Sequence, residues 1–261
     1  MWFIGVILLL AGAGCLYAAI RQQRLVYAMM AAETLPVPAL EQMRAISDEL
    51  GAGGSFRKIC EVVGLTHPGP HGLLRSELTG TECVWHGHRV QRRYKHYQRD
   101  SEGRTTVTTR TETVAEHASE AGFALLSDGR TIGVDHGGRR PDGVEQVADR
   151  FERSGPGSAG GGWLETLGAV ARSGRDETIG YQYTEWVLRP GIQMYVLGEV
   201  HDATGSLVIA PPADRKHPFV LSTRSEAQLT ASGRTRQRWF AWGGAGLIVL
   251  GLVMVVAGLV G

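Results

Sequence analysis

The chain has 261 residues, of which 43% are hydrophobic, and a formal net charge of +1. A charge so close to neutral argues against a general nucleic-acid-binding protein, which needs a strongly basic face. The cysteines Cys15, Cys60 and Cys83 have no CxxC spacing, so they predict neither a disulfide framework nor a zinc ribbon. We expect Cys60 and Cys83 to be buried thiols.

The first predicted element is an uncharged apolar segment at residues 2–20, in an N-terminal region that we bound at residues 1–24. As an α-helix this segment is about 28 Å long, close to the thickness of the hydrocarbon core of a bilayer. A cleaved signal peptide usually carries basic residues before its apolar core, and none precedes Trp2. We therefore interpret the segment as an uncleaved transmembrane helix.

A helical linker is predicted for residues 25–54. The first helix continues to residue 32, and residues 35–38 interrupt it because they contain two prolines. Residues 39–50 then form an amphipathic helix, since apolar side chains recur at a spacing of three to four residues. These side chains are Leu40, Met43, Ile46 and Leu50.

From residue 55 to residue 222 the pattern is that of a β domain. The clearest strand is residues 83–97, and the threonine-rich residues 105–114 are its predicted antiparallel partner. Further strands are predicted at residues 122–126, 130–134, 178–188, 193–200 and 206–209. Short strands at this spacing predict a barrel or a sandwich. The expected fold class is an α+β membrane protein whose soluble part is mainly β.

Side chains alternate along the strand at residues 83–97. One side carries Val84, His86, His88, Val90, Tyr94 and His96. The other side carries Trp85, Arg89, Gln91, Arg93 and Lys95. We expect the second side to be an exposed basic face.

A glycine-rich loop and a short helix, residues 154–172, are predicted as an insertion in the β domain. Gly155, Gly157 and Gly160 match the GxGxxG pattern. A dinucleotide site needs an apolar strand before these glycines, whereas residues 149–154 are polar and charged. We therefore assign no nucleotide site.

The chain ends in a polar helix, residues 223–238, that runs into a second apolar segment at residues 239–261. The apolar segment is about 33 Å long as a helix and has no polar face, which favours a membrane span over a buried core helix. Trp239 and Trp242 stand at its start, where indoles prefer the headgroup layer.

The arginines beside the two spans predict the orientation of the protein. Arg21 and Arg24 follow the first span, and Arg234, Arg236 and Arg238 precede the second. Positive charges close to span ends stay on the cytoplasmic side. We expect a two-pass protein of a bacterial plasma (inner) membrane with its central domain in the cytoplasm.

The residues suggest little chemistry. His86, His88 and His96 share one side of a strand, which makes His86 and His88 weak candidates for a metal site, but no acidic residue stands in line with them. Structural or solvent-facing histidines are the favoured interpretation. The sequence contains no GxSxG, HExxH or Walker motif, so the residues themselves predict neither an enzyme nor a cofactor.

Four segments of the chain together resemble the GIDE domain, also called the barrel-associated domain of the mitochondrial-anchored ubiquitin ligase. These segments are ICEVVG at 59–64, LRSELTGTECVW at 74–85, EWVL at 185–188 and YVLGEV at 195–200. Their order, their spacing and the flanking apolar spans are similar to those of the family. The resemblance covers most of residues 40–210 and rests on turns and strands rather than on catalytic side chains.

The resemblance implies an E3 ubiquitin-protein ligase with a role in organelle organisation. In eukaryotic members a RING domain follows the second span and binds zinc through eight Cys and His ligands. No cysteine follows Cys83 here, so we expect the RING and its zinc to be absent.

Three functional hypotheses follow. The first is a non-catalytic, membrane-tethered interaction or scaffold domain that binds a protein, peptide or lipid partner at the membrane surface, through the loop at residues 68–80 and the basic face. Its candidate binding residues are Arg75, Ser76, Thr79, Arg89, Arg93 and Lys95. The second is ubiquitin-transferase-like activity through a partner. The third is a metal-dependent enzyme that uses His86 and His88.

Overall fold

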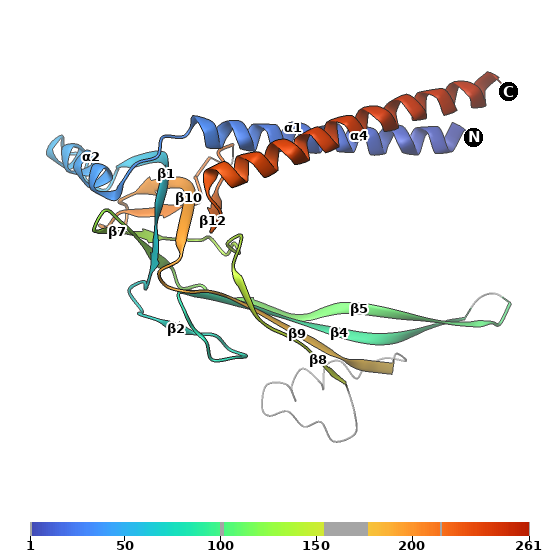
Figure 1. The fold of residues 1–261 in the computed structure, drawn as a ribbon, viewed down its shortest axis with the longest axis horizontal. Helices are drawn as coiled ribbons and strands as arrows, with labels where there is room; N and C mark the ends of the chain where they lie inside the picture. The colour runs from blue at the N-terminus through green and yellow to red at the C-terminus, as the bar shows by residue number, and fades with distance from the viewer. Residues whose placement is uncertain (1, 100–101, 154–176, 215, 261) are drawn as a thin grey trace. The chain divides into compact units, whose positions relative to one another are not determined.

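The computed structural model describes residues 2–99, 102–153, 177–214 and 216–260 (Figure 1). The predicted loop and helix at 154–172 lie outside the described residues. The helices are α1 (Trp2–Ala31), α2 (Val37–Glu49) and α4 (Glu226–Val260). The strands are β1 (Arg57–His67), β2 (Leu74–Arg75), β3 (Glu82–Cys83), β4 (Trp85–Arg99), β5 (Thr105–Ala118), β6 (Phe123–Ser127), β7 (Arg130–Val134), β8 (Glu145–Arg153), β9 (Glu177–Leu188), β10 (Gln193–His201), β11 (Val208–Ala210) and β12 (Val220–Ser222).

The chain divides into two compact units. The first comprises residues 1–64, 126–132 and 193–261, and the second comprises residues 65–125 and 133–192. Among the described residues, the first unit holds α1, α2 and α4, whereas the second holds most of the long strands.

Five strands close into a barrel in the order β1-β6-β7-β11-β10, because β10 pairs with β1 as well as with β11. The short strand β12 adds to β10. The closure leaves no long unpaired edge on these strands, which removes a common site of aggregation. Apolar side chains of four barrel strands are almost fully buried: Val62, Ile132, Met194, Val196 and Ile209. The expected fold class, a mainly β domain between two apolar helices, is confirmed.

The helices α1 and α4 lie side by side, with the two chain termini at the same end (Figure 1). Glycines allow this close approach. A Cβ added at Gly12 would lie 2.6 Å from Ile248 Cγ1 and 3.0 Å from the Gly244 carbonyl, and a Cβ at Gly251 would lie 2.9 Å from the Gly5 carbonyl. Small residues at such contacts are typical of helices that pack within a membrane.

Both helices are long and apolar enough to cross a membrane. Their outer faces carry large apolar side chains that are exposed in the described part of the chain: Leu10 is 70% exposed, Ile7 64% and Val249 62%. A soluble helix hairpin would expose polar side chains on this surface. The two expected membrane spans are therefore supported by the packing of the helices as well as by their composition.

We call the antiparallel pair of α1 and α4 the helical hairpin, although almost two hundred residues separate the two helices in the chain. One end of this hairpin packs on the barrel. Val26 and Met29 of α1 form one buried cluster with Tyr195 and Leu197 of β10. Leu229 of α4 also packs against this cluster. The apolar contact fixes the barrel to the two helices within the first unit.

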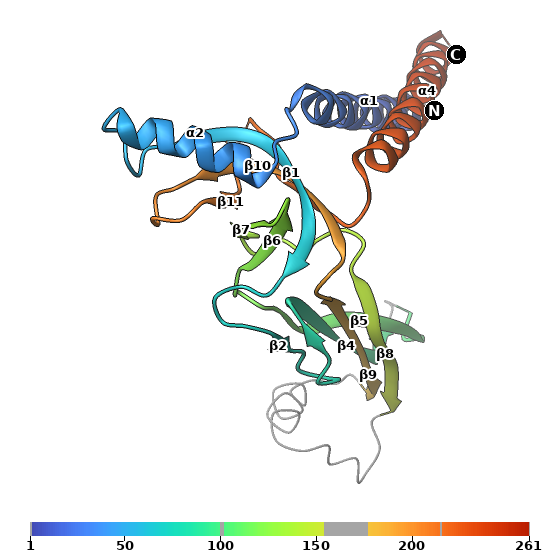
Figure 2. The same cartoon turned by 60° about the vertical axis from the view of Figure 1, so that its left-hand side comes forward.

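The second unit contains a four-stranded antiparallel sheet in the order β5-β4-β9-β8 (Figure 2). The predicted pairing of residues 83–97 with residues 105–114 is confirmed, since β4 and β5 pair from Gly87↔Ala118 to Arg99↔Thr105. The polar and charged residues 149–153 belong to β8, a strand that the sequence pattern did not predict. This strand lies at the edge of the sheet and is mostly exposed, so its sequence has no apolar alternation to reveal it.

The first third of β4 departs from the predicted exposure. Trp85 was expected on an exposed basic face but is 1% exposed, and His86 on the opposite side is 7% exposed. Both faces of the strand are covered at this end, whereas Arg93 and Tyr97 near the other end are exposed. Alternation therefore gives the correct side for each residue, and the covering segments decide which residues are buried.

Candidate functional site

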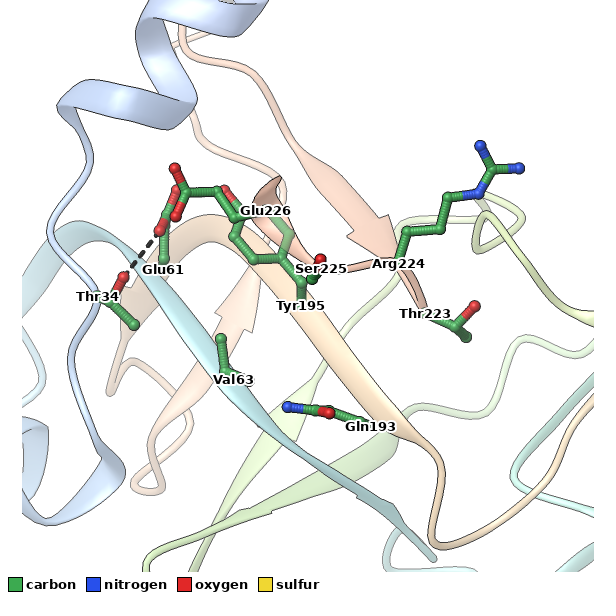
Figure 3. Close-up of a pocket in the computed structure, with 9 residues that line it drawn as sticks. All are labelled: Thr34, Glu61, Val63, Gln193, Tyr195, Thr223, Arg224, Ser225 and Glu226. Carbon is green, nitrogen blue, oxygen red and sulfur yellow. Dashed lines mark hydrogen bonds between the residues drawn. The ribbon is translucent and has the colours of Figure 1, made fainter. Parts of the chain in front are cut away.

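A pocket of about 100 Å³ opens in the first unit between the α1–α2 connection, β1, β10 and the start of α4 (Figure 3). Most of the residues that line it have polar or charged side chains: Thr34, Glu61, Val63, Gln193, Tyr195, Thr223, Arg224, Ser225 and Glu226. The segments meet here because Thr34 forms a parallel bridge with Glu61 of β1, in which Glu61 N donates to the Glu33 carbonyl and Leu35 N donates to the Glu61 carbonyl, each at 2.9 Å.

Glu61 is the central group of this pocket and is only 1% exposed. The Tyr195 hydroxyl donates to one carboxyl oxygen, and Thr34 Oγ1 donates to the other at 2.9 Å. Burial raises the pKa of Glu61 above its usual value, although the hydrogen bonds from Tyr195 and Thr34 act in the opposite direction. Glu61 therefore ties the chain after α1 to two barrel strands.

A second buried carboxylate, Asp202, holds the segment between α2 and β1 in the first unit. Asp202 is 1% exposed and accepts hydrogen bonds from Phe56 N at 3.0 Å and from Gly54 N at 3.2 Å. Arg44 Nε of α2 lies 3.7 Å from the same carboxylate. This carboxylate thus fixes α2 and the start of β1 together.

A third carboxylate, Glu185 of β9, organises the loop between β2 and β3 in the second unit. It is 0% exposed. It accepts hydrogen bonds from Ser76 Oγ at 3.0 Å, Leu78 N at 2.7 Å, Thr79 N at 3.0 Å and Thr79 Oγ1 at 2.7 Å. Burial acts to raise the pKa of Glu185, but these hydrogen bonds outweigh it and leave the pKa lowered. Glu185 is therefore a charged anchor for the loop.

The six candidate binding residues fall into two groups. Ser76 is 3% exposed, and its hydroxyl serves the internal anchor, so it is not on the predicted surface. Thr79 is exposed but also donates to Glu185. Arg75 lies beside them on β2 and pairs with Glu82 at 3.2 Å.

The other three candidates lie along one side of β4. Arg89 donates to Glu116 of β5 at 2.6 Å, and Lys95 donates to Glu177 of β9 at 3.1 Å. Arg93 is exposed. The predicted basic face therefore exists, but acidic partners on both neighbouring strands offset much of its charge.

Guanidinium groups on this sheet stack on aromatic rings. Trp186 of β9 has Arg140 at 3.8 Å and Arg89 at 5.7 Å from its ring centre. Arg93 lies 5.3 Å from the Phe151 ring of β8. Alternate residues of β4 share one face of the sheet, so Arg89 and Arg93 lie on the same face as Gly87 and Gln91. Trp186 lies on this face because it is opposite Gly87. Phe151 does too, because both Phe151 and Gln91 are opposite Gln182. We call these four residues and Arg140 the arginine–aromatic ladder.

The histidines come together in a way that the linear pattern missed. His88 of β4 and His117 of β5 have ring centres 5.8 Å apart, and the Glu77 carboxylate lies 3.3 Å from His88 Nδ1 and 3.4 Å from His117 Nε2. No acidic residue stands in line with His86 and His88 along the strand, but the β2–β3 loop brings Glu77 to His88. Among the described residues, no three His, Cys, Asp or Glu side chains are arranged to hold a metal ion.

A cavity of about 210 Å³ lies beside this group in the second unit. It is lined by Trp85, Gly87, His88, Glu116, His117, Ala118, Gly138, Arg140 and Trp186. Burial and the neighbouring Arg89 lower the pKa of Arg140 from its usual value.

Cys60 and Cys83 are both 0% exposed, as expected, and burial raises the pKa of each thiol to about 11. Neither thiol is therefore a nucleophile at neutral pH.

Two buried histidines make stability depend on pH. Burial lowers the pKa of His86 and of His136, so the unfolded chain takes up protons below about pH 6.5 before the folded chain does. Their contribution to stability is therefore present above that pH and is lost as the pH falls through the lowered values. We expect the thermal unfolding midpoint of the purified protein in detergent to fall between pH 7 and pH 5, and the double variant His86→Gln/His136→Gln to lose most of this fall.

The double variant is needed for comparison because Glu61 changes the stability of the protein with pH in the opposite direction to the two histidines. Its raised pKa stabilises the folded state at low pH, and this contribution is lost as the pH rises through the raised value. An equal fall in midpoint for the native protein and the double variant contradicts the assignment to the histidines.

A model of the GIDE family, described as E3 ubiquitin ligase, matches residues 93–257, from the middle of β4 to the end of α4. No curated protein and no solved structure matches the chain. The match lies within the β domain and the second apolar helix, and it covers well over half of the chain. The chain therefore belongs to the GIDE family, which is described as E3 ubiquitin ligase.

Proposed function

We propose that this chain is a membrane-tethered protein-binding domain of the ubiquitin-ligase type, which positions a protein partner at the membrane and has no transfer chemistry of its own. The observation that supports it is the arginine–aromatic ladder on one face of the four-stranded sheet. Arg, Trp and Tyr are the residues that contribute most binding energy at protein interfaces.

The ladder is denser than packing alone requires. Significant cation–π pairs occur about once per 70–80 residues. Here the second unit has the three pairs of the ladder as well as Arg92 with Tyr94 at 4.8 Å and Arg150 with Tyr183 at 5.4 Å. Phe151 is 36% exposed, although it is a large apolar side chain. An exposed apolar ring that contacts the guanidinium group of Arg93 is suited to contact with a second protein.

The buried carboxylates support the non-catalytic part of the proposal. Glu61, Glu185 and Asp202 each accept hydrogen bonds from segments that they fasten together. A general acid or base needs a proton that it can exchange with a substrate. These three groups are occupied in joining the α1–α2 connection, the β2–β3 loop and the α2–β1 segment to the strands.

Photo-crosslinking in native membranes tests the docking face. A crosslinker at Gln91, on the ladder face, is expected to trap a defined protein, and Arg93→Ala/Phe151→Ala is expected to reduce that product roughly tenfold or more. A crosslinker at the exposed Glu152, which lies on the opposite face of β8, is the matched control. Equal trapping from both positions, or a product unchanged in the double variant, contradicts the proposed face.

A reconstituted ubiquitination assay tests the non-catalytic part. With activating enzyme, conjugating enzymes, ubiquitin and ATP, the purified full chain is expected to give no conjugates above the level without it. Conjugates that depend on the purified chain alone contradict this proposal and favour an intrinsic transferase. Conjugates that appear only with a crosslinked partner support the scaffold role.

The proposed location is a bacterial inner membrane with the β domain in the cytoplasm. It is supported by Arg21, Arg24 and the three arginines before the second span. Protease added outside intact spheroplasts is expected to leave the β domain whole and to digest it after lysis. Digestion in intact spheroplasts contradicts this orientation.

A further inference from the structure

We propose that the helical hairpin carries an anionic-lipid binding belt, made by Arg21 and Arg24 of α1 and by Arg234, Arg236 and Arg238 of α4, which takes the phosphate groups of acidic phospholipids. The proposal concerns the first unit and does not depend on the docking face of the sheet.

The packing of the helices brings the five arginines to one level. A Cβ added at Gly233 would meet Val26 Cγ2 at 2.6 Å and Gln22 Nε2 at 3.1 Å, and one added at Gly244 would meet Cys15 Cβ at 3.1 Å. The part of α4 between these two glycines thus runs antiparallel to the part of α1 between Cys15 and Val26. All five arginines lie within these facing segments. At 1.5 Å per residue, Arg21 and Arg24 are about 4.5 Å apart along α1, and the three on α4 span about 6 Å.

The belt is a region of unbalanced positive charge. Residues 2–32 and 227–260 contain no Asp, Glu or Lys, so their charged side chains are the five arginines. All five are exposed. Arg234 Nη2 contacts Met30 Sδ at 3.0 Å. In the described part of the chain, no carboxylate forms an ion pair with any of the five.

Exposed aromatic side chains mark the membrane boundary next to the belt. Trp239 is 76% exposed, Trp242 79% and Tyr17 70%, and each lies just beyond the arginines toward the chain termini. Such rings favour the headgroup layer. The helix from Trp239 to Val260 is about 32 Å long, which matches the hydrocarbon core of a bilayer. The belt therefore lies at the depth of the lipid phosphates.

The chemistry favours anionic lipid headgroups over other occupants of this level. Guanidinium groups bind phosphate in a bidentate manner, and a zwitterionic headgroup brings its own cation close to that phosphate. Basic residues beside a membrane span attract acidic lipids, and salt screens this attraction. Five exposed arginines in the facing segments of α1 and α4 can contact several phosphates at once.

Fluorescence quenching by brominated lipids tests the belt in the full chain. The protein is reconstituted in bilayers of phosphatidylcholine and phosphatidylglycerol, one of which carries bromine on its acyl chains, so that Trp239 and Trp242 report the lipid beside them. We expect phosphatidylglycerol to be preferred roughly fivefold or more, and the preference to weaken in high salt. Because both leaflets have the same composition, the result does not depend on orientation.

The variant with all five arginines replaced by glutamine is expected to show a preference close to one. The control Arg130→Gln/Arg150→Gln removes two arginines from strands outside the hairpin and is expected to keep the native preference. Far-UV circular dichroism confirms that each variant is folded. Equal binding of the two lipids by the native protein, or a preference that survives loss of the belt, overturns the proposal.

Discussion

Glu185→Ala is expected to release the β2–β3 loop from the four-stranded sheet and to lower the free energy of unfolding by about 3 kcal/mol. The carboxylate accepts hydrogen bonds from Ser76 Oγ, Leu78 N, Thr79 N and Thr79 Oγ1 and is 0% exposed. Removing it leaves the buried Ser76 hydroxyl and three partly buried donors without this acceptor, which costs more than the loss of one surface hydrogen bond.

Limited trypsin digestion measures this release, because Arg75 stands at the start of the loop. Cleavage after Arg75 is expected to be slow in the native protein, fast in Glu185→Ala and intermediate in Glu185→Gln, which keeps the shape but loses the charge. The control is Glu177→Ala, also on β9, whose side chain is 58% exposed. If Arg75 is cut at the same rate in Glu185→Ala and in the control, the loop is not anchored as described.

Gly12→Leu is expected to force α1 and α4 apart. The first side-chain carbon alone would lie 2.6 Å from Ile248 Cγ1 and 3.0 Å from the Gly244 carbonyl, and the remaining three carbons have no space. Inserting a large side chain into a packed contact typically costs about 1–3 kcal/mol, and here it also separates two helices along their length.

The neighbouring glycine gives a matched control. A Cβ added at Gly14 meets nothing within 4 Å, so Gly14→Leu adds the same apolar group to the same helix on the lipid-facing side. Unfolding by increasing fractions of SDS in mixed micelles is expected to occur earlier for Gly12→Leu than for the native protein and for Gly14→Leu. Equal midpoints for the two leucine variants contradict the helix contact.

The parts of the fold that were predicted correctly depend on local patterns. Uncharged runs about as long as a bilayer core is thick identify α1 and α4, and a threonine-rich run identifies β5. A Ser-Asp-Gly turn gives the β6–β7 hairpin, in which Asp128 and Gly129 both have positive φ, 49° and 76°. Each of these signals lies within a few residues, so no knowledge of distant contacts is needed.

The parts that were missed depend on contacts between distant residues. β8 has few apolar residues because it is an exposed edge, and it forms because β9 offers a partner. Glu185 lies in a correctly predicted strand, but its function as an anchor depends on a loop about one hundred residues earlier. Glu77 reaches His88 in the same way. No periodicity in the chain records these approaches.

The candidate binding residues show the same division. Arg89, Arg93 and Lys95 were placed on one side of a strand by alternation, and the structure has them there. Alternation does not show that Arg89 faces Glu116 or that Trp186 lies under two guanidinium groups, because these neighbours come from other strands. Ser76 looked like part of an exposed polar loop, yet its hydroxyl points to a buried carboxylate.

We expect α1 and α4 to form one packed hairpin in a membrane and to hold the β domain at its surface. Cys15 allows a direct test, because a Cβ added at Gly244 would lie 3.1 Å from Cys15 Cβ, close to the separation of about 3.5–4.5 Å in disulfides. Gly244→Cys is oxidised in isolated membranes and digested with trypsin, which cuts after Arg21 and Arg238.

The expected product is a disulfide that joins the peptides of residues 1–21 and 239–261, found by mass spectrometry in the membrane fraction. Gly243→Cys and Gly246→Cys are the controls, since a Cβ at either position meets nothing within 4 Å, and neither is expected to form the link. Failure of Gly244→Cys to crosslink, equal crosslinking by the controls, or recovery of the chain in the soluble fraction without detergent contradicts the packing of α1 against α4 in a membrane.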